Sequence, residues 1–133
     1  MKIRMKENSL IFDFQCQSID KSNAKTIKKK LLKIYLSSNI HNLILNMESV
    51  EFIDSYGLDV LLFAGNLAQQ ENGKISLYGL TPFLVKFLMQ SRMYRFFDIN
   101  KTEEESIEYI KDKEFGSTCT YNTIRTKLQM QFA

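Results

Sequence analysis

The chain has 133 residues, 44% of them hydrophobic and 25% charged, which is typical of one globular domain and excludes a disordered chain. No apolar run reaches about 18 residues, so we expect no membrane insertion, and residues 1–7 lack the apolar centre of a signal peptide. The two cysteines, Cys16 and Cys119, cannot form a disulfide framework and have no neighbouring zinc ligand. We therefore expect a cytoplasmic protein that needs no cofactor and no metal.

The net charge of +3 is unevenly distributed along the chain. Residues 1–36 carry nine basic and three acidic side chains, whereas residues 37–110 carry five basic and ten acidic ones. Aromatic residues do not alternate with arginines, as they often do in proteins that bind nucleic acid. We therefore expect no direct contact with nucleic acid.

The first sixteen residues have the pattern of a β-hairpin. Residues 1–6 alternate apolar and basic side chains, residues 7–9 have turn chemistry, and residues 10–16 continue as a second strand. The residues of the second strand that we expect to face the core are Leu10, Phe12, Phe14 and Cys16.

An amphipathic helix and a buried strand are predicted next. Residues 18–23 contain several residue types that commonly begin helices, and apolar side chains then recur at helical spacing between Ala24 and Tyr35. Lysines occupy the other side of this segment, which is typical of a solvated helix face. Residues 42–47 are almost continuously apolar, as in a strand that is covered on both faces of a sheet.

The alternation of helices and strands continues to residue 110. A helix is predicted from Gly57 to a stop at Asn72-Gly73, followed by a strand over 74–79. A short helix from Pro82 and a strand over 95–99 come next. The last helix is predicted from Thr102, with a solvated, acidic first turn at 103–105. This order predicts an α/β domain with a largely parallel sheet.

The last residues have the clearest period of two in the chain. Apolar and polar side chains alternate from Ile124 to Phe132, which predicts a further strand near residues 119–132. Such a strand must pair with a sheet edge of its own molecule or of a second one, and the second arrangement would create a homodimer. We assign residues 1–110 to the main domain and residues 111–133 to a C-terminal extension.

The most informative stretch joins the strand over 42–47 to the helix from Gly57. Its loop has the sequence Phe52-Ile53-Asp54-Ser55-Tyr56-Gly57-Leu58. Ser55 lies at or near the start of the helix, where its hydroxyl can accept a backbone N–H, and Gly57 allows a tight turn. From the residues alone, an ordinary helix cap is the favoured interpretation of Ser55.

This block resembles the signature of the STAS domain, specifically of the bacterial anti-sigma factor antagonists. Ile19-Asp20 before Ala24, residues 71–74, and the apolar pattern over 85–99 resemble the family in the same order, so that the resemblance extends over residues 8–110. It implies a mixed β-sheet of four to five strands with about four helices packed on it, to which the predicted C-terminal strand would be an addition.

The resemblance also implies a phosphorylation switch. In this family the serine after the loop aspartate is phosphorylated by the partner, and that serine is Ser55 here. The partner would be an anti-sigma factor serine kinase with a histidine-kinase-like ATPase fold, which releases its sigma factor when it binds the unphosphorylated antagonist. A PP2C-type phosphatase would reset the switch. Asp54, Tyr56 and Gly57 would shape the loop that the partner contacts, and Asp20 would belong to the same surface.

Four positions depart from the family pattern. Tyr56 replaces the small residue that usually follows the phosphorylated serine, and Asp59 stands where glycine is frequent. Gln17-Ser18 replaces a glycine before the first helix, and Arg92 replaces the glycine that is usual in the segment Ser91-Arg92-Met93. We expect these changes to affect the fit of the kinase rather than the fold.

The sequence leaves three other interpretations to weigh against this one. An enzyme is not favoured, because Ser55 lacks the glycine that leads a nucleophile elbow and because the only histidine, His41, is expected about 15 Å away at the opposite end of a strand. A STAS scaffold or sensor subunit that is not phosphorylated, or a cytoplasmic partner of a membrane transport complex, remains the alternative function. A small-ligand pocket is the third, but we expect its candidate residues to pack in the core instead: Phe12, Phe14, Phe52, Phe63, Phe83 and Phe87.

Overall fold

A computed structural model describes residues 1–111, and the strand predicted near residues 119–132 lies outside these residues. A mixed five-stranded sheet forms the centre, and only its first strand is antiparallel to its neighbour. Its strands, in spatial order, are β1 (Lys2–Lys6), β2 (Ser9–Asp13), β4 (Asn42–Asn46), β6 (Ile75–Tyr78) and β7 (Asp98–Asn100). The predicted α/β domain with a mixed sheet is therefore confirmed.

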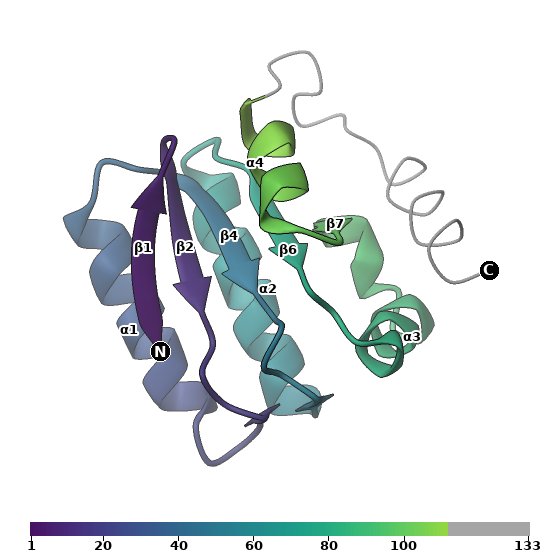
Figure 1. The fold of residues 1–133 in the computed structure, drawn as a ribbon. Coiled ribbons are helices and arrows are strands. Elements are labelled where there is room, and N and C mark those ends of the chain that lie inside the picture. Colours follow the sequence, from purple (N-terminus) through teal and green to yellow (C-terminus); the bar gives the residue numbers. More distant parts are fainter. Residues whose placement is uncertain (112–133) are drawn as a thin grey trace.

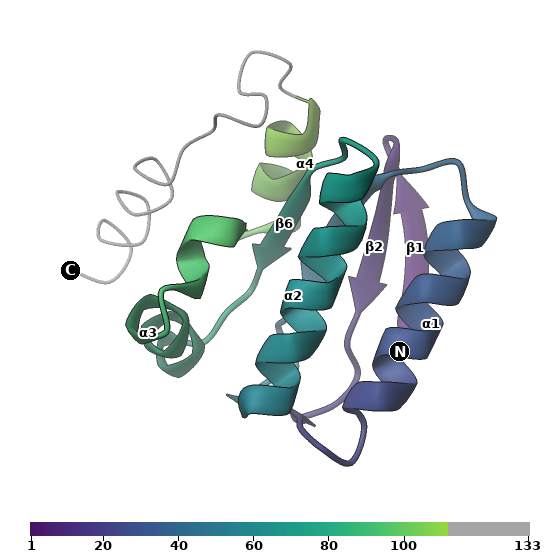
Figure 2. The same cartoon turned by 180° about the vertical axis from the view of Figure 1, so that it is seen from behind.

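Helices cover both faces of this sheet unequally (Figures 1 and 2). The two longest helices, α1 (Ala24–Ser37) and α2 (Ser55–Gln70), lie side by side on one face, and α4 (Glu103–Lys111) lies on the other. The remaining elements are α3 (Pro82–Gln90), the 3₁₀ turn η1 (Met93–Phe96) and a small separate sheet made of β3 (Ser18–Ile19) and β5 (Phe52–Ile53). The main core lies under α1 and α2, and a smaller one lies under α4.

The N-terminal hairpin forms as predicted. Its turn residues, Glu7 and Asn8, have φ angles of 48° and 64°, which suit a two-residue turn between twisted strands. Of the residues expected to face the core, only Cys16 stays partly exposed. Ile11 points to the opposite face and is nevertheless fully buried, because α4 covers that face. Strand β2 is therefore a central strand with two apolar faces.

Helices α1 and α2 follow the predicted pattern with one shifted boundary. Helix α1 buries one side and leaves most of its lysines in solvent. Helix α2 begins at Ser55, two residues before the predicted start at Gly57, because Asp54 is its N-cap residue. Asn72 has a φ of 58° directly after the helix, which confirms the predicted stop.

The strand predicted over 95–99 is wrong in its position. Residues 93–96 form η1, and only Asp98–Asn100 pair with β6. Arg92 begins this turn at φ 61°, a left-handed conformation that glycine adopts most easily. This conformation agrees with the glycine that the resemblance leads us to expect at this position, and the turn uses the residues that would otherwise extend the strand.

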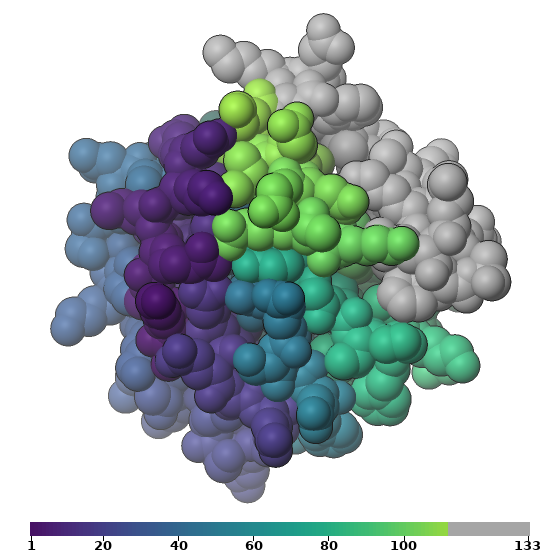
Figure 3. All heavy atoms as spheres, in the orientation of Figure 1, coloured from purple at the N-terminus to yellow at the C-terminus, as the bar shows by residue number. Residues whose placement is uncertain are grey.

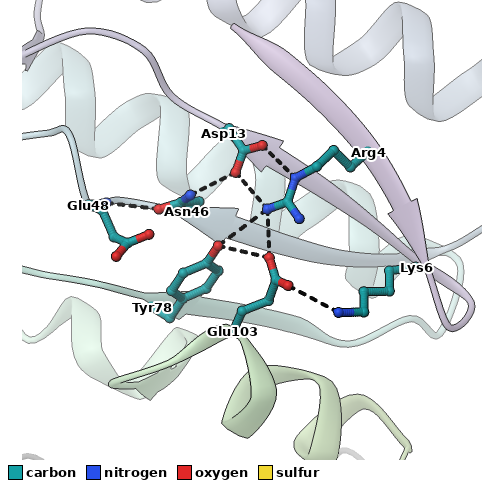
Figure 4. A network of polar contacts seen from close by, with 7 residues as sticks. All are labelled: Arg4, Lys6, Asp13, Asn46, Glu48, Tyr78 and Glu103. Carbon is teal, nitrogen blue, oxygen red and sulfur yellow. Dashed lines mark hydrogen bonds and ion pairs between the residues drawn. The ribbon is translucent and has the colours of Figure 1, made fainter.

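A charged network joins α4 to the hairpin (Figure 4). The guanidinium of Arg4 donates hydrogen bonds to Asp13 (2.6 and 2.8 Å) and to Glu103 (2.6 Å), and it holds the pKa of both carboxyls below the usual range. The Tyr78 hydroxyl donates to Glu103 (3.1 Å), and the Asn46 amide donates to Asp13 (2.7 Å). The expectation of a solvated Glu103 is wrong. Its hydrogen bond with Arg4 holds α4 beside β1, and the two elements are in contact in Figure 3.

Candidate functional site

The small β3–β5 sheet brings together the two loops that contain the predicted site residues. Ser18 pairs with Phe52 and Ile19 with Ile53, beyond the carboxyl ends of β2 and β4 (Figure 1). The backbone N–H of Asp54 donates to the carbonyl oxygen of Ile19, with an N···O distance of 3.4 Å. This pairing places the loop that contains Asp20 beside the loop that contains Ser55.

Asp54, and not Ser55, caps helix α2. The Asp54 carboxylate accepts hydrogen bonds from the backbone N–H groups of Tyr56 (2.9 Å) and Gly57 (3.1 Å). Ser55 is the first residue of the helix and is exposed, and its hydroxyl has no hydrogen-bond partner among residues 1–111. The fold therefore does not need the Ser55 hydroxyl, and interpreting this residue as an ordinary cap is wrong.

Gly57 allows α2 to start in direct contact with β3. A Cβ atom at this position would lie 2.4 Å from the carbonyl oxygen of Ile19 and 2.3 Å from Cγ2 of Ile53. Both distances are far below van der Waals contact, so no other residue fits without a shift of the backbone. The glycine serves a close approach between two elements rather than the tight turn that we predicted.

Asp20 lies on the same surface, but its carboxylate is bound within its own loop. It accepts hydrogen bonds from the backbone N–H of Ser22 (2.9 Å), from the Ser22 hydroxyl (2.5 Å) and from the Ser18 hydroxyl (3.0 Å). These bonds lower the pKa of the Asp20 carboxyl, with the Ser22 hydroxyl as the main cause. Asp20 therefore adds a stable negative charge to the surface around Ser55.

Three phenylalanines form a row next to this loop, two of them exposed and the third, Phe87, half-buried. The ring centroids of Phe52 and Phe83 lie 6.4 Å apart and those of Phe83 and Phe87 lie 6.2 Å apart, with interplanar angles of 22° and 14°. Phe52 is 47% exposed and Phe83 is 51% exposed, so the expectation that they pack in the core is wrong. Tyr56, beside Ser55, is 48% exposed. Exposed aromatic side chains gathered around one loop are typical of a protein-binding surface.

The sequence did not predict the phenylalanine row (Phe52, Phe83 and Phe87), because each of its members stands next to apolar residues that are buried. Phe52 directly precedes the buried Ile53, and a strand that alternates exposed and buried residues places it outside. Phe83 and Phe87 lie four residues apart on α3, and each directly precedes a buried leucine, Leu84 or Leu88. A helix that is apolar on both sides is the one signal that could have indicated this row.

Helix α1 contributes a charged contact behind Ser55. The Lys28 ammonium forms an ion pair with the carboxylate of Asp59 on α2, and its Nζ lies 5.7 Å from the ring centroid of Phe63. Asp59 is one of the positions at which the sequence departs from the pattern that it resembles. The sequence did not predict this ion pair, because its members belong to different helices and are separated by 31 positions.

His41 lies far from this loop in the fold. It is exposed directly before β4, and its ring centroid lies 5.9 Å from that of Tyr35, whereas Ser55 follows the small sheet beyond the carboxyl end of β4. Among residues 1–111, no three histidine, cysteine or acidic side chains are placed to hold a metal ion. The helices of this part of the chain are also too short or too polar to cross a membrane.

Comparison with known proteins identifies the family of this domain and similar solved structures. Residues 1–106 match the STAS domain. A Thermotoga maritima protein, TM1081, proposed to be an anti-sigma factor antagonist, superposes with a TM-score of 0.76 at 20% identity over 84% of this chain and 94% of its own. The anti-sigma factor antagonist SpoIIAA, unphosphorylated, gives 0.64 at 19% identity over 83% and 96%.

The phosphorylated form of SpoIIAA from Bacillus gives the same TM-score of 0.64, at 20% identity over 83% of this chain and 98% of its own. At these identities the solved structures establish a common fold, with its five-stranded mixed sheet and helices. The family follows from the match over residues 1–106, which include the whole Ser55 loop. This chain belongs to the STAS-domain family.

Proposed function

We propose that this STAS-domain chain is an anti-sigma factor antagonist that is switched off by phosphorylation of Ser55. The observation that carries the proposal is the exposed Ser55 hydroxyl, which has no partner among residues 1–111 and lies beside the phenylalanine row. SpoIIAA, a structural relative and an anti-sigma factor antagonist, has been solved in both its unphosphorylated and its phosphorylated form.

In the unphosphorylated state, the partner covers the Ser55 loop and the phenylalanine row together. The partner is an anti-sigma factor serine kinase, and its sigma factor is released when the antagonist binds. Tyr56 and Phe52 offer large, half-exposed rings on this surface, and rings of this kind commonly supply most of the affinity of an interface. The unmodified Ser55 hydroxyl is neutral, so such a contact does not have to remove a charge from water.

Phosphorylation then changes the charge of the same surface. The kinase transfers the γ-phosphoryl group of ATP to Ser55 Oγ, the hydroxyl proton passes to a base of the kinase, and ADP leaves. The phosphate adds about −1.5 to −2 charges. Because the Asp54 carboxylate already accepts the N–H groups of Tyr56 and Gly57, the start of α2 offers the phosphate little further compensation. The surface that the partner contacts therefore gains negative charge, which favours release.

The proposed cycle closes in the cytoplasm through a PP2C-type phosphatase. Water attacks the phosphorus atom, inorganic phosphate leaves, and the Ser55 hydroxyl is restored. The antagonist itself catalyses neither step, and its partners are proteins rather than nucleic acid.

The proposal is tested by mass analysis of the full chain isolated from its native cells, with peptide mapping across residues 43–74. We expect one phosphate on Ser55, absent in Ser55→Ala and retained in Ser49→Ala, which removes another exposed serine hydroxyl a few residues earlier. A phosphate that persists in Ser55→Ala would place the modification elsewhere and contradict the proposal.

The same variants separate the switch from the alternative function. Unphosphorylated wild type and Ser55→Ala should both capture a kinase with a histidine-kinase-like ATPase fold in a pull-down, and the phosphorylated chain should not. If no phosphate is found under growth or stress, and a permease or ATPase subunit is captured instead, the chain is a STAS scaffold and the phosphorylation switch is wrong.

A further inference from the structure

The ion pair between Lys28 and Asp59 lies on the same side of α2 as Ser55. Resting on the proposed phosphorylation of Ser55, we propose that Lys28 is the intramolecular counter-ion of the phosphoserine, and that its ammonium exchanges the Asp59 carboxylate for the phosphate. The STAS match gives the family, but it assigns no role to this lysine.

The helix geometry brings the three groups together. Ser55 and Asp59 are four residues apart in α2, so their side chains lie on one face, one helical turn apart. The Lys28 ammonium is bound to Asp59, and α1 and α2 run side by side with their N-terminal ends at the same end of the sheet (Figure 2). The ammonium therefore needs to move by only about one helical turn, roughly 5.4 Å, to reach a phosphate on Ser55.

The present ion pair is of a kind that exchanges easily. The Lys28 and Asp59 side chains are 32% and 58% exposed, and ion pairs with this exposure contribute little to stability. A phosphate dianion one turn from Asp59 repels its carboxylate and is the stronger acceptor for an ammonium. The Lys28 Nζ also lies 5.7 Å from the centroid of the Phe63 ring, and this cation–π contact helps to keep the lysine beside α2, near both acceptors.

Other charged groups around Ser55 are less suited to this role. Asp54 and Asp20 carry negative charge and are hydrogen-bonded within their own loops. Lys25, one turn earlier on α1, is exposed and forms no ion pair within residues 1–111, so it is the rival cation. Lys28 differs from Lys25 in already lying against α2, where the Asp59 and Phe63 contacts hold it.

The exchange has a consequence for the surface that the partner contacts. Once Lys28 binds the phosphate, the Asp59 carboxylate loses its ion pair and faces solvent as a charge of its own. The modification then alters two neighbouring positions of α2 instead of one. Asp59, which replaces a frequent glycine of the family, thus extends the region over which this chain responds to phosphate.

The test uses the full chain with phosphoserine incorporated at position 55 by genetic encoding, and follows the phosphate by ³¹P NMR during a pH titration. A nearby ammonium stabilises the dianion and lowers the apparent pKa of the phosphate, which is about 6 without such a neighbour. Lys28→Met should therefore raise this pKa by about 0.5. Asp59→Asn should lower it, because a negative neighbour is removed and Lys28 keeps only the phosphate as its partner.

Three further variants make the result specific. Lys33→Met removes the same charge from a distant turn of α1 and should leave the phosphate pKa unchanged, whereas Lys28→Arg keeps the charge and should preserve the wild-type titration. If Lys28→Met titrates like the wild type, or if Lys25→Met has an equal effect, the specific counter-ion is excluded. Because the phosphate is installed directly, these outcomes do not depend on whether cells phosphorylate Ser55, which the mass analysis tests separately.

Discussion

A Cβ atom on Gly57 would lie 2.4 Å from the carbonyl oxygen of Ile19, so helix α2 and strand β3 touch through their backbones. Gly57→Ala must therefore displace backbone, and we expect it to lower the free energy of unfolding by about 2 kcal/mol or more, in spite of the higher helix propensity of alanine. Urea denaturation of both proteins measures this difference.

Gly65 of the same helix is the matched control. A Cβ atom there would lie 3.4 Å from Cε1 of Phe97, which is an ordinary contact distance. Gly65→Ala should leave stability unchanged or raise it by about 0.5–1 kcal/mol. Equal destabilisation by the two substitutions would show that the close approach at Gly57 is not what matters.

Asp54 supplies the cap of α2 and should be replaceable only by another capping residue. Asp54→Ala leaves the N–H groups of Tyr56 and Gly57 without their acceptor, and we expect a loss of about 1 kcal/mol. Asp54→Ser should recover most of this loss, since serine is also a good N-cap residue. Thermal unfolding of the three proteins gives the comparison, and a serine variant no more stable than the alanine variant would contradict the capping role.

The phenylalanine row should contribute to binding and little to stability. Phe83→Ala should weaken binding to the kinase recovered in the pull-down at least about tenfold, which corresponds to about 1.4 kcal/mol. Its thermal midpoint should change little, because the Phe83 side chain is already half exposed. Leu36→Ala removes another exposed apolar side chain, on α1, and should leave the affinity unchanged. Equal losses of affinity would assign the effect to general surface hydrophobicity.

The Arg4 network predicts a pH-dependent contribution to stability. Because Arg4 lowers the pKa of Asp13 and Glu103 in the folded state, the stabilisation is complete above pH 4.5, the ordinary value for a glutamate, and is lost as the pH falls through the lowered values. Arg4→Met should cost about 1–2 kcal/mol near pH 7, with allowance for the exposed part of the arginine, and much less near pH 2.5.

Lys6→Met provides the control for this network. Lys6 lies 3.4 Å from Glu103 but is half exposed, so its removal should have a smaller effect at every pH. Chemical denaturation across this pH range measures both variants. A difference between wild type and Arg4→Met that stays constant into acid would show that the lost packing of the arginine stem, and not its charge, is responsible.

Most of the fold could be predicted from the sequence because its signals are local. The strand over 42–47 and the helix stop at Asn72 follow from neighbouring residues, and the structure confirms them. The loop around Ser55 was located by its sequence, although its cap was assigned to the wrong neighbour. Both Asp54 and Ser55 are good capping residues, and only the extended backbone at Asp54 determines which of them accepts the N–H groups.

The contacts that the sequence did not predict join residues far apart in the chain. Arg4 and Glu103 are separated by 99 positions, and the exposed stacking of Phe52 on Phe83 depends on how α3 packs beside the small sheet. The prediction of a strand over 95–99 was wrong for a different reason. Apolar and aromatic residues also suit a 3₁₀ turn, and this turn forms because Arg92 adopts a left-handed conformation. Long-range pairing and turn geometry leave no regular period in a sequence.

The β3–β5 pairing also restricts the lengths of the two loops that it joins. From the last matched pair of the large sheet, Asp13 with Asn46, to the first pair of the small sheet, Ser18 with Phe52, one connection advances five residues and the other six. Surface loops usually tolerate insertions, but both ends of these two loops are held by strand pairing. An inserted residue that shifted β3 by one position along β5 would turn Ile19 or Ile53 outward and displace Ser55, so we expect natural length variation in this domain to lie elsewhere.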